Sequence, residues 1–125
     1  MTDNTWLPSA AKPFAIVEAD FGDDKYKFGL SWKHASEWEK EHGRSLYAVF
    51  LEAVRLRHMA LHDIREAVRL ALVGAGAEPT AALRLVRQYV EERPGAENLP
   101  LAVSILDAFF HGQPAQTEAS DGAGV

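Results

Sequence analysis

Hydrophobic and polar residues alternate in two short runs near the N-terminus. The apolar members of these runs are Val17, Ala19, Phe21, Tyr26, Phe28 and Leu30. A period of two is typical of half-buried β-strands. Gly22, Asp23 and Asp24 stand between the runs and favour a tight turn. The pattern therefore predicts a β-hairpin over residues 14–30.

From Ser31 onward the apolar period lengthens to about 3.6 residues, which is typical of amphipathic helices. Helices are predicted from Ser31 to Gly43, from Ser45 onward, over about 62–73, from Pro79 to Pro94, and over about 98–111, with serine caps and glycine or proline stops. The apolar positions of the first four are Trp32, Ala35, Trp38, Leu46, Tyr47, Phe50, Leu51, Val54, Ile64, Val68, Ala71, Leu72, Leu83, Val86, Tyr89 and Val90. The expected fold class is α+β, an N-terminal β-hairpin followed by a bundle of four to five α-helices.

Three segments differ in composition. Residues 1–13 are polar and proline-containing, and we expect a flexible N-terminal arm. Residues 113–125 are rich in small and polar residues, and we expect a disordered C-terminal tail. The predicted domain spans 14–112.

The composition excludes several kinds of protein. The chain has 125 residues and no cysteine, so disulfides, thiolate zinc sites and cysteine nucleophiles are ruled out. No stretch approaches the roughly 20 apolar residues that span a bilayer, and the N-terminus lacks an apolar signal core. We therefore expect a cytoplasmic protein with no membrane partner.

Charge bears on nucleic-acid binding. The formal net charge is −5, yet every arginine lies between Arg44 and Arg93. The third and fourth helices could form a helix-turn-helix that presents Arg84, Arg87 and Gln88. Because glutamates are interleaved with these arginines, a solvated face is favoured, and a DNA-binding regulator is kept only as an alternative.

No residue set predicts catalysis or a cofactor. His58 and His62 are four apart, but Met59 stands where a metalloprotease helix would carry glutamate. The acidic cluster of Asp20, Asp23 and Asp24 has too few ligands for a calcium loop. Gly74-Ala75-Gly76 follows a helix, so it reads as a helix stop, and no serine lies in a nucleophile elbow. We expect no enzyme, no metal site and no cofactor.

The last predicted helix is apolar almost all round. Leu99, Ala102, Leu106 and one of the adjacent phenylalanines can share a core-facing side, whereas Leu101, Ile105 and the other phenylalanine point elsewhere. Such a helix is either central to the bundle or half covered by a partner. In the second case Leu101, Ile105, Phe109 and Phe110 are the candidate partner-binding residues, forming a groove wall for an amphipathic helix.

Three stretches together carry a family resemblance. They are Phe21-Gly22-Asp23 with Tyr26-Lys27-Phe28, Asp63-Ile64-Arg65-Glu66-Ala67-Val68-Arg69-Leu70-Ala71-Leu72 leading into Gly74-Ala75-Gly76, and Arg93-Pro94 through Leu101, Ala102, Ile105 and Leu106 to Gly112. Over residues 14–112 the chain resembles the small tail assembly chaperones of phages and gene transfer agents. Members often carry three glycines where this chain has Gly74-Ala75-Gly76, and a larger residue at Gly95.

The resemblance implies a non-enzymatic assembly factor that binds the tape measure protein, aids assembly of the tail tube protein, and is absent from the finished particle. A structural tail component that stays in the particle is the alternative. The hairpin adds a further expectation, because a lone two-stranded sheet has two unpaired edges. These edges predict homo-oligomerisation or capture of a partner strand.

Overall fold

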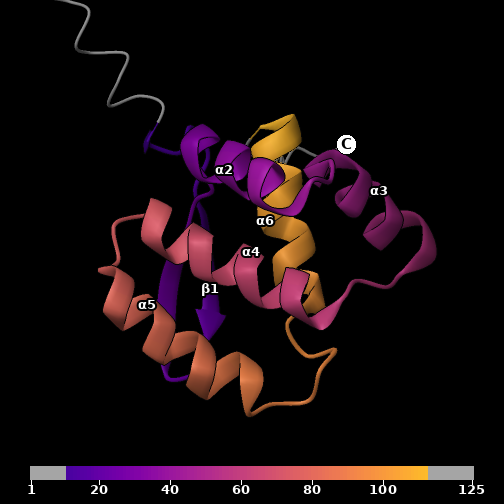
Figure 1. Ribbon diagram of the computed structural model, residues 1–125. Coiled ribbons are helices and arrows are strands. Elements are labelled where there is room, and N and C mark those ends of the chain that lie inside the picture. Colours follow the sequence, from indigo (N-terminus) through magenta and orange to yellow (C-terminus); the bar gives the residue numbers. More distant parts are fainter. Residues whose placement is uncertain (1–10, 113–125) are drawn as a thin grey trace, which may run out of the picture.

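The computed structural model describes residues 11–112, and Figure 1 shows how its elements are arranged. The elements are β1 (Val17–Phe21), β2 (Asp24–Phe28), α2 (Trp32–His42), α3 (Leu46–Leu56), α4 (Leu61–Gly74), α5 (Pro79–Val86), the π-helical turn η1 (Arg87–Glu91) and α6 (Leu99–His111). This order confirms the predicted α+β class, a hairpin followed by helices. Residues 1–10 of the expected arm and the whole expected tail, 113–125, lie outside the described residues.

A two-residue turn closes the hairpin. The strands are antiparallel, and Phe21 lies opposite Asp24. Gly22 has φ 64°, whereas Asp23 has no positive φ, which is the type II′ pattern with glycine at the first central position. The Tyr26 hydroxyl donates to the Asp23 carboxylate at 2.8 Å. Asp23 therefore stabilises the turn, in keeping with the predicted turn at Gly22, Asp23 and Asp24.

A non-local contact holds the turn against the helices. The Tyr89 ring, on η1, packs edge-on against Phe21 with centroids 5.7 Å apart. A Cβ on Gly22 would stand 2.4 Å from the Tyr89 ring. The buried Asn98 donates from Nδ2 to the Tyr89 carbonyl at 2.9 Å, which satisfies an acceptor in the irregular turn. The π-turn was not predicted, and it places Tyr89 over the hairpin.

Replacing Gly22 with alanine is expected to cost about 2–3 kcal/mol of unfolding free energy, because strain at positive φ adds to a clash with the Tyr89 ring. Gly43 has the same φ of 64°, with nothing within 4 Å of an added Cβ. Gly43→Ala therefore measures the backbone strain alone, expected at about 1 kcal/mol. Urea denaturation of both variants checks the difference. Equal losses would show that Tyr89 moves aside without cost.

Capping residues set the starts of α2 and α3. The Ser31 hydroxyl accepts from the His34 backbone N–H at 3.1 Å, and Ser45 accepts from Ala48 at 3.0 Å. Gly43 ends α2 in the left-handed conformation. The predicted caps and stop are confirmed. They fix where each helix enters the bundle.

Three apolar residues of these helices lie further out than the periodicity suggests. Trp32 is 69% exposed, while Ala35 and Trp38 on the same helix are buried. Tyr47 and Val54 of α3 are also exposed, and its buried residues are Leu46, Val49, Phe50 and Ala53. Trp32 and Tyr47 both lie in the first turn of their helices, beyond the edge of the core.

The hairpin and α4 meet backbone to backbone. The Gly29 N–H donates to the Ala71 carbonyl at 2.9 Å. Gly74 is the last residue of α4 and lies so close that its Cβ would be 2.0 Å from the Gly29 carbonyl oxygen. The helix thus ends within Gly74-Ala75-Gly76, as the sequence predicted. The lack of a side chain at Gly74 permits the contact.

The last helix, α6, lies behind α4 in Figure 1, and its end reaches α2 and α3. Its buried residues are Ala102, Ile105, Leu106 and Ala108. Ile105 is 1% exposed, so the expectation that it shares an open side with Leu101 is wrong. Leu101 is half-buried and packs against the core. At Ile105 the fold thus favours the reading of α6 as a central helix.

Candidate interaction surface

Aromatic side chains gather where the end of α6 meets the starts of α2 and α3. We call Phe14, Trp32, Tyr47, Phe109 and Phe110 the aromatic end. Phe110 lies 4.9 Å from both Phe109 and Tyr47, and Phe109 lies 6.1 Å from Phe14, measured between ring centroids. Phe14 is 67% exposed and Trp32 69%. Large apolar side chains exposed together mark interaction sites on soluble proteins.

A groove of about 130 Å³ opens within the aromatic end. Its lining residues are Trp32, Ala35, Ser36, Glu39, Leu46, Phe109 and Phe110. The walls come from three helices, and most of the surface is apolar with a polar rim from Ser36 and Glu39. This chemistry suits an apolar side chain from a partner helix.

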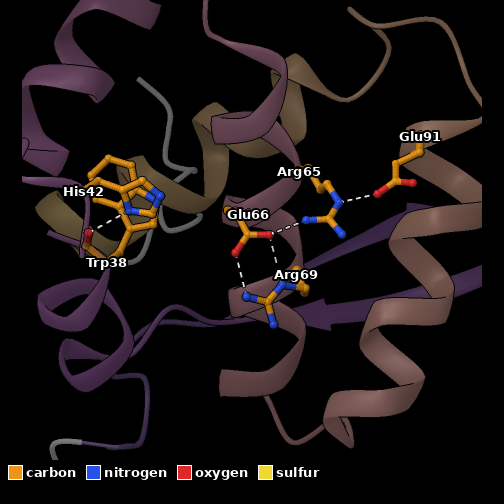
Figure 2. Close-up of polar contacts among 6 residues, drawn as sticks. All are labelled: Trp38, His42, Arg65, Glu66, Arg69 and Glu91. Atoms are coloured by element: carbon orange, nitrogen blue, oxygen red, sulfur yellow. Dashed lines mark hydrogen bonds and ion pairs between the residues drawn. The ribbon is translucent and has the colours of Figure 1, made fainter. Parts of the chain in front are cut away.

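Hydrogen bonds hold the helices beside the groove in place. The Glu39 carboxylate accepts from the Leu46 N–H at 2.7 Å, and so joins α2 to the start of α3. His42 stacks on Trp38 with ring centroids 4.6 Å apart, and its Nδ1 donates to the Trp38 carbonyl at 2.9 Å (Figure 2). Arg44 covers the Trp38 ring at 5.0 Å. These contacts hold α2 against the start of α3, and a wall that is fixed before binding lowers the entropic cost of binding.

A buried carboxylate on α4, that of Glu66, is the centre of an ion network (Figure 2). The Glu66 carboxylate accepts from Arg65 Nη1 at 2.7 Å and from Arg69 Nη2 at 2.6 Å. Arg65 also pairs with Glu91 of η1. Burial raises the pKa of Glu66, but the hydrogen bond from Arg69 and the charges of both arginines outweigh it and leave this pKa lowered. The network joins α4 to the π-turn and serves the fold.

A second buried carboxylate, Asp63, accepts from Arg44 Nη2 at 2.8 Å. The pairing connects the start of α4 to the loop between α2 and α3. The sequence did not predict these ion pairs. The signal is weak, because a charged residue in a helix gives no indication of a partner 19 positions away.

The structure separates the predicted partner-binding residues. Phe109 and Phe110 belong to the aromatic end, Leu101 is half-buried, and Ile105 is in the core. Trp32 and Phe14 complete the surface and were not predicted as part of it. For Trp32, the sequence does contain a signal for this position. Trp32 directly follows the cap Ser31, so its side chain lies at the rim of the bundle.

Other sequence candidates bring no new chemistry. The chain leaves the helix between Leu56 and Leu61, with Arg57 at φ 60°, so His58 and His62 do not share a helical face. Within residues 11–112 no three His, Cys, Asp or Glu side chains come together as a metal site would require. Arg84 and Arg87 are exposed, and DNA reading by α5 stays an alternative prediction. None of the helices described is long and apolar enough to cross a membrane.

Comparison with known proteins identifies the family. The model of the family described as "phage tail tube protein, GTA-gp10" matches residues 15–112, which is more than half of the chain. No curated protein and no solved structure matches significantly. The predicted kinship with phage and gene transfer agent tail proteins is confirmed, and the family is of a structural, non-enzymatic kind. The chain therefore belongs to the phage tail tube protein family GTA-gp10.

Proposed function

We propose that this protein is a non-enzymatic tail assembly chaperone of a phage or gene transfer agent, which binds the tape measure protein through its aromatic end. The observation that carries the proposal is the exposed aromatic end on a fold of a tail protein family. A tape measure protein is long and aggregation-prone, and a chaperone must cover its apolar helical segments. An apolar groove between helices suits that task.

The proposal includes the place of action. The chaperone works in the cytoplasm of the bacterial host, delivers the tape measure protein to the tail tube protein, and leaves before the particle is complete. Co-expression with the tape measure protein of the same tail gene cluster is the direct test. We expect a soluble complex that co-purifies. A tape measure protein that stays insoluble and unbound would refute the proposal.

A structural tail tube component is the second candidate, and the description of the matched family favours it. The two candidates differ in whether the protein is present in the finished particle. Mass spectrometry of purified particles is expected to find no copies of a chaperone, whereas a tube component would be present in many copies per particle. Stoichiometric presence in the tail would replace the chaperone proposal with the structural one.

Substituting the aromatic end is expected to weaken binding without unfolding the protein. Trp32→Ser and Phe14→Ser remove side chains that are about two-thirds exposed, so their cost to folding is small. Each should weaken the complex with the tape measure protein about tenfold or more, since exposed aromatic anchors carry much of an interface's energy. Isothermal titration calorimetry measures the change.

Leu61→Ser is the matched control, because Leu61 is also 69% exposed but begins α4 outside the aromatic end. Its affinity should equal that of the unaltered chain. If Leu61→Ser weakens binding and Trp32→Ser does not, the partner lies on a different surface. Circular dichroism confirms that all three variants stay folded.

A further inference from the structure

Helix α3 has a largely exposed outer face, opposite the side that it buries. Leu46, Val49, Phe50 and Ala53 recur at i, i+3, i+4 and i+7 and are buried. The same spacing on the opposite side is occupied by Ala48, Leu51, Glu52 and Arg55. Of these, Leu51 is half-buried, and the other three are exposed. We call this second set, with the exposed Val54 beside it, the outer face of α3.

The charges on this face lack partners within the described chain. Some exposed acids form ion pairs with a base one helical turn away, as Glu37 does with Lys33 and Glu97 with Arg93. Glu52 and Arg55 form no ion pair or hydrogen bond with any residue of 11–112. They are three positions apart and so lie on the same flank of the helix. An acid and a base that are both unpaired on one flank can pair with the same two residues on an antiparallel copy.

We propose that the outer face of α3 is a homodimer interface in which α3 packs antiparallel against α3 of a second copy of this chain. A two-fold axis between Glu52 and Ala53 sets Leu51 level with Val54 of the second copy, so apolar residues meet at the centre. Ala48 is small and permits close approach of the helices.

The same axis pairs the charges twice. Measured along the helix axis, Arg55 of the second copy is offset from Glu52 by two residues. At a rise of 1.5 Å per residue, this offset is about 3 Å. This offset is within reach of a glutamate and an arginine side chain. The two-fold operation repeats the pair on the other side of the axis, so both unpaired charges are matched. A different partner protein has no reason to match this self-complementary arrangement.

The inference is separate from the proposed function. The dimer surface lies on the outer side of α3, and the tape measure surface is the aromatic end, so either can fail alone. It also differs from the expectation from the hairpin. There the outward side chains are Glu18 and Asp20 on β1 and Lys25 and Lys27 on β2. Two-fold pairing of either edge with itself would place like charges side by side, which is destabilising.

Charge reversal tests the dimer. In Glu52→Arg every cross-pair becomes Arg with Arg, and in Arg55→Glu every cross-pair becomes Glu with Glu. Sedimentation velocity of the full chain is expected to show a concentration-dependent dimer. Each single variant should raise the dimer dissociation constant by about tenfold or more at low salt.

Mixing the two single variants gives the decisive result. One chain then supplies two arginines and the other supplies two glutamates, so a heterodimer restores both cross-pairs. We expect the mixture to dimerise again with the affinity of the unaltered chain, and a Glu52→Arg, Arg55→Glu double variant to do the same. Restoration on mixing would not occur if the variants had merely lost their fold.

The controls lie on α5 and beyond η1. Arg84→Glu and Glu92→Arg reverse charges that are exposed elsewhere, and they should leave the dimer unchanged. A chain that is monomeric at all accessible concentrations would overturn the proposal. So would a dimer that single reversals do not weaken, or one that the mixture does not restore.

Discussion

Gly74→Ala is expected to lower the unfolding free energy by about 3 kcal/mol or more. The added Cβ would lie 2.0 Å from the Gly29 carbonyl oxygen, well inside contact distance; the oxygen belongs to the backbone, and the Cβ is bonded directly to it at Cα. Relief requires α4 to move away from the segment after β2, which breaks the hydrogen bond from Gly29 to Ala71. Helix propensity alone would give the opposite sign, a gain of up to about 1 kcal/mol for alanine. The clash decides because backbone cannot rotate out of the way.

Thermal and urea denaturation measure this loss. For a domain of this size, 3 kcal/mol corresponds to a fall in Tm of roughly 10–20 °C. Gly95→Ala is the control, since its Cβ would meet only the end of the Leu61 side chain at 3.1 Å, which can rotate. It should change stability by less than about 1 kcal/mol. A stabilised Gly74→Ala would show that α4 and the hairpin do not meet as described.

Glu66→Gln is the second large effect, expected at about 2–3 kcal/mol at pH 7. The amide keeps the shape of the side chain but cannot hold two guanidinium groups, so Arg65 and Arg69 lose their shared carboxylate in a half-buried position. Breaking one partner of a buried ion pair is more costly than losing an exposed pair. Glu97→Gln breaks the exposed pair with Arg93 and should cost less than about 0.5 kcal/mol.

The pH dependence of Glu66→Gln follows from the sign of the shift. Burial raises the folded-state pKa of Glu66, but the hydrogen bond from Arg69 and the charges of both arginines outweigh burial and hold this pKa below its ordinary value of 4.5. A carboxyl group whose pKa is lowered by folding stabilises the protein at pH values above its unfolded-state pKa. This contribution is lost as the pH falls through the folded-state pKa. The gap between the two proteins should therefore be constant near pH 7 and close below pH 4.5. Urea curves at pH 7 and pH 3.5 measure it, and a gap that widens in acid would contradict the assignment.

Local signals determined most of the secondary structure. The hairpin turn, the caps Ser31 and Ser45, and the stop at Gly43 all act within a few residues of themselves, so sequence reasoning places them correctly. The π-turn depends instead on Asn98 binding the Tyr89 carbonyl and on Arg65 pairing with Glu91. Neither partner is near in sequence, so periodicity alone predicts an ordinary helix there.

The candidate surface was predicted only in part, for a geometric reason. An all-apolar helix gives no preferred side, so the sequence could not decide whether Ile105 faces the core or a partner. Phe109 and Phe110 were candidates because one of the pair falls on the second apolar side of that helix. Trp32 continues the helical spacing of Ala35 and Trp38, yet the core does not extend to the first turn of α2.

The central position of α6 has a consequence for how the protein is made. The hairpin is the first described element to leave the ribosome, but the residues that bury it come from α4, η1 and α6, up to 90 positions later in the chain. Until α6 emerges, Phe21 and Phe28 have no complete apolar surface to pack against. Stable folding therefore waits until nearly the whole described chain has been synthesised, and fragments released before α6 would be substrates for host proteases.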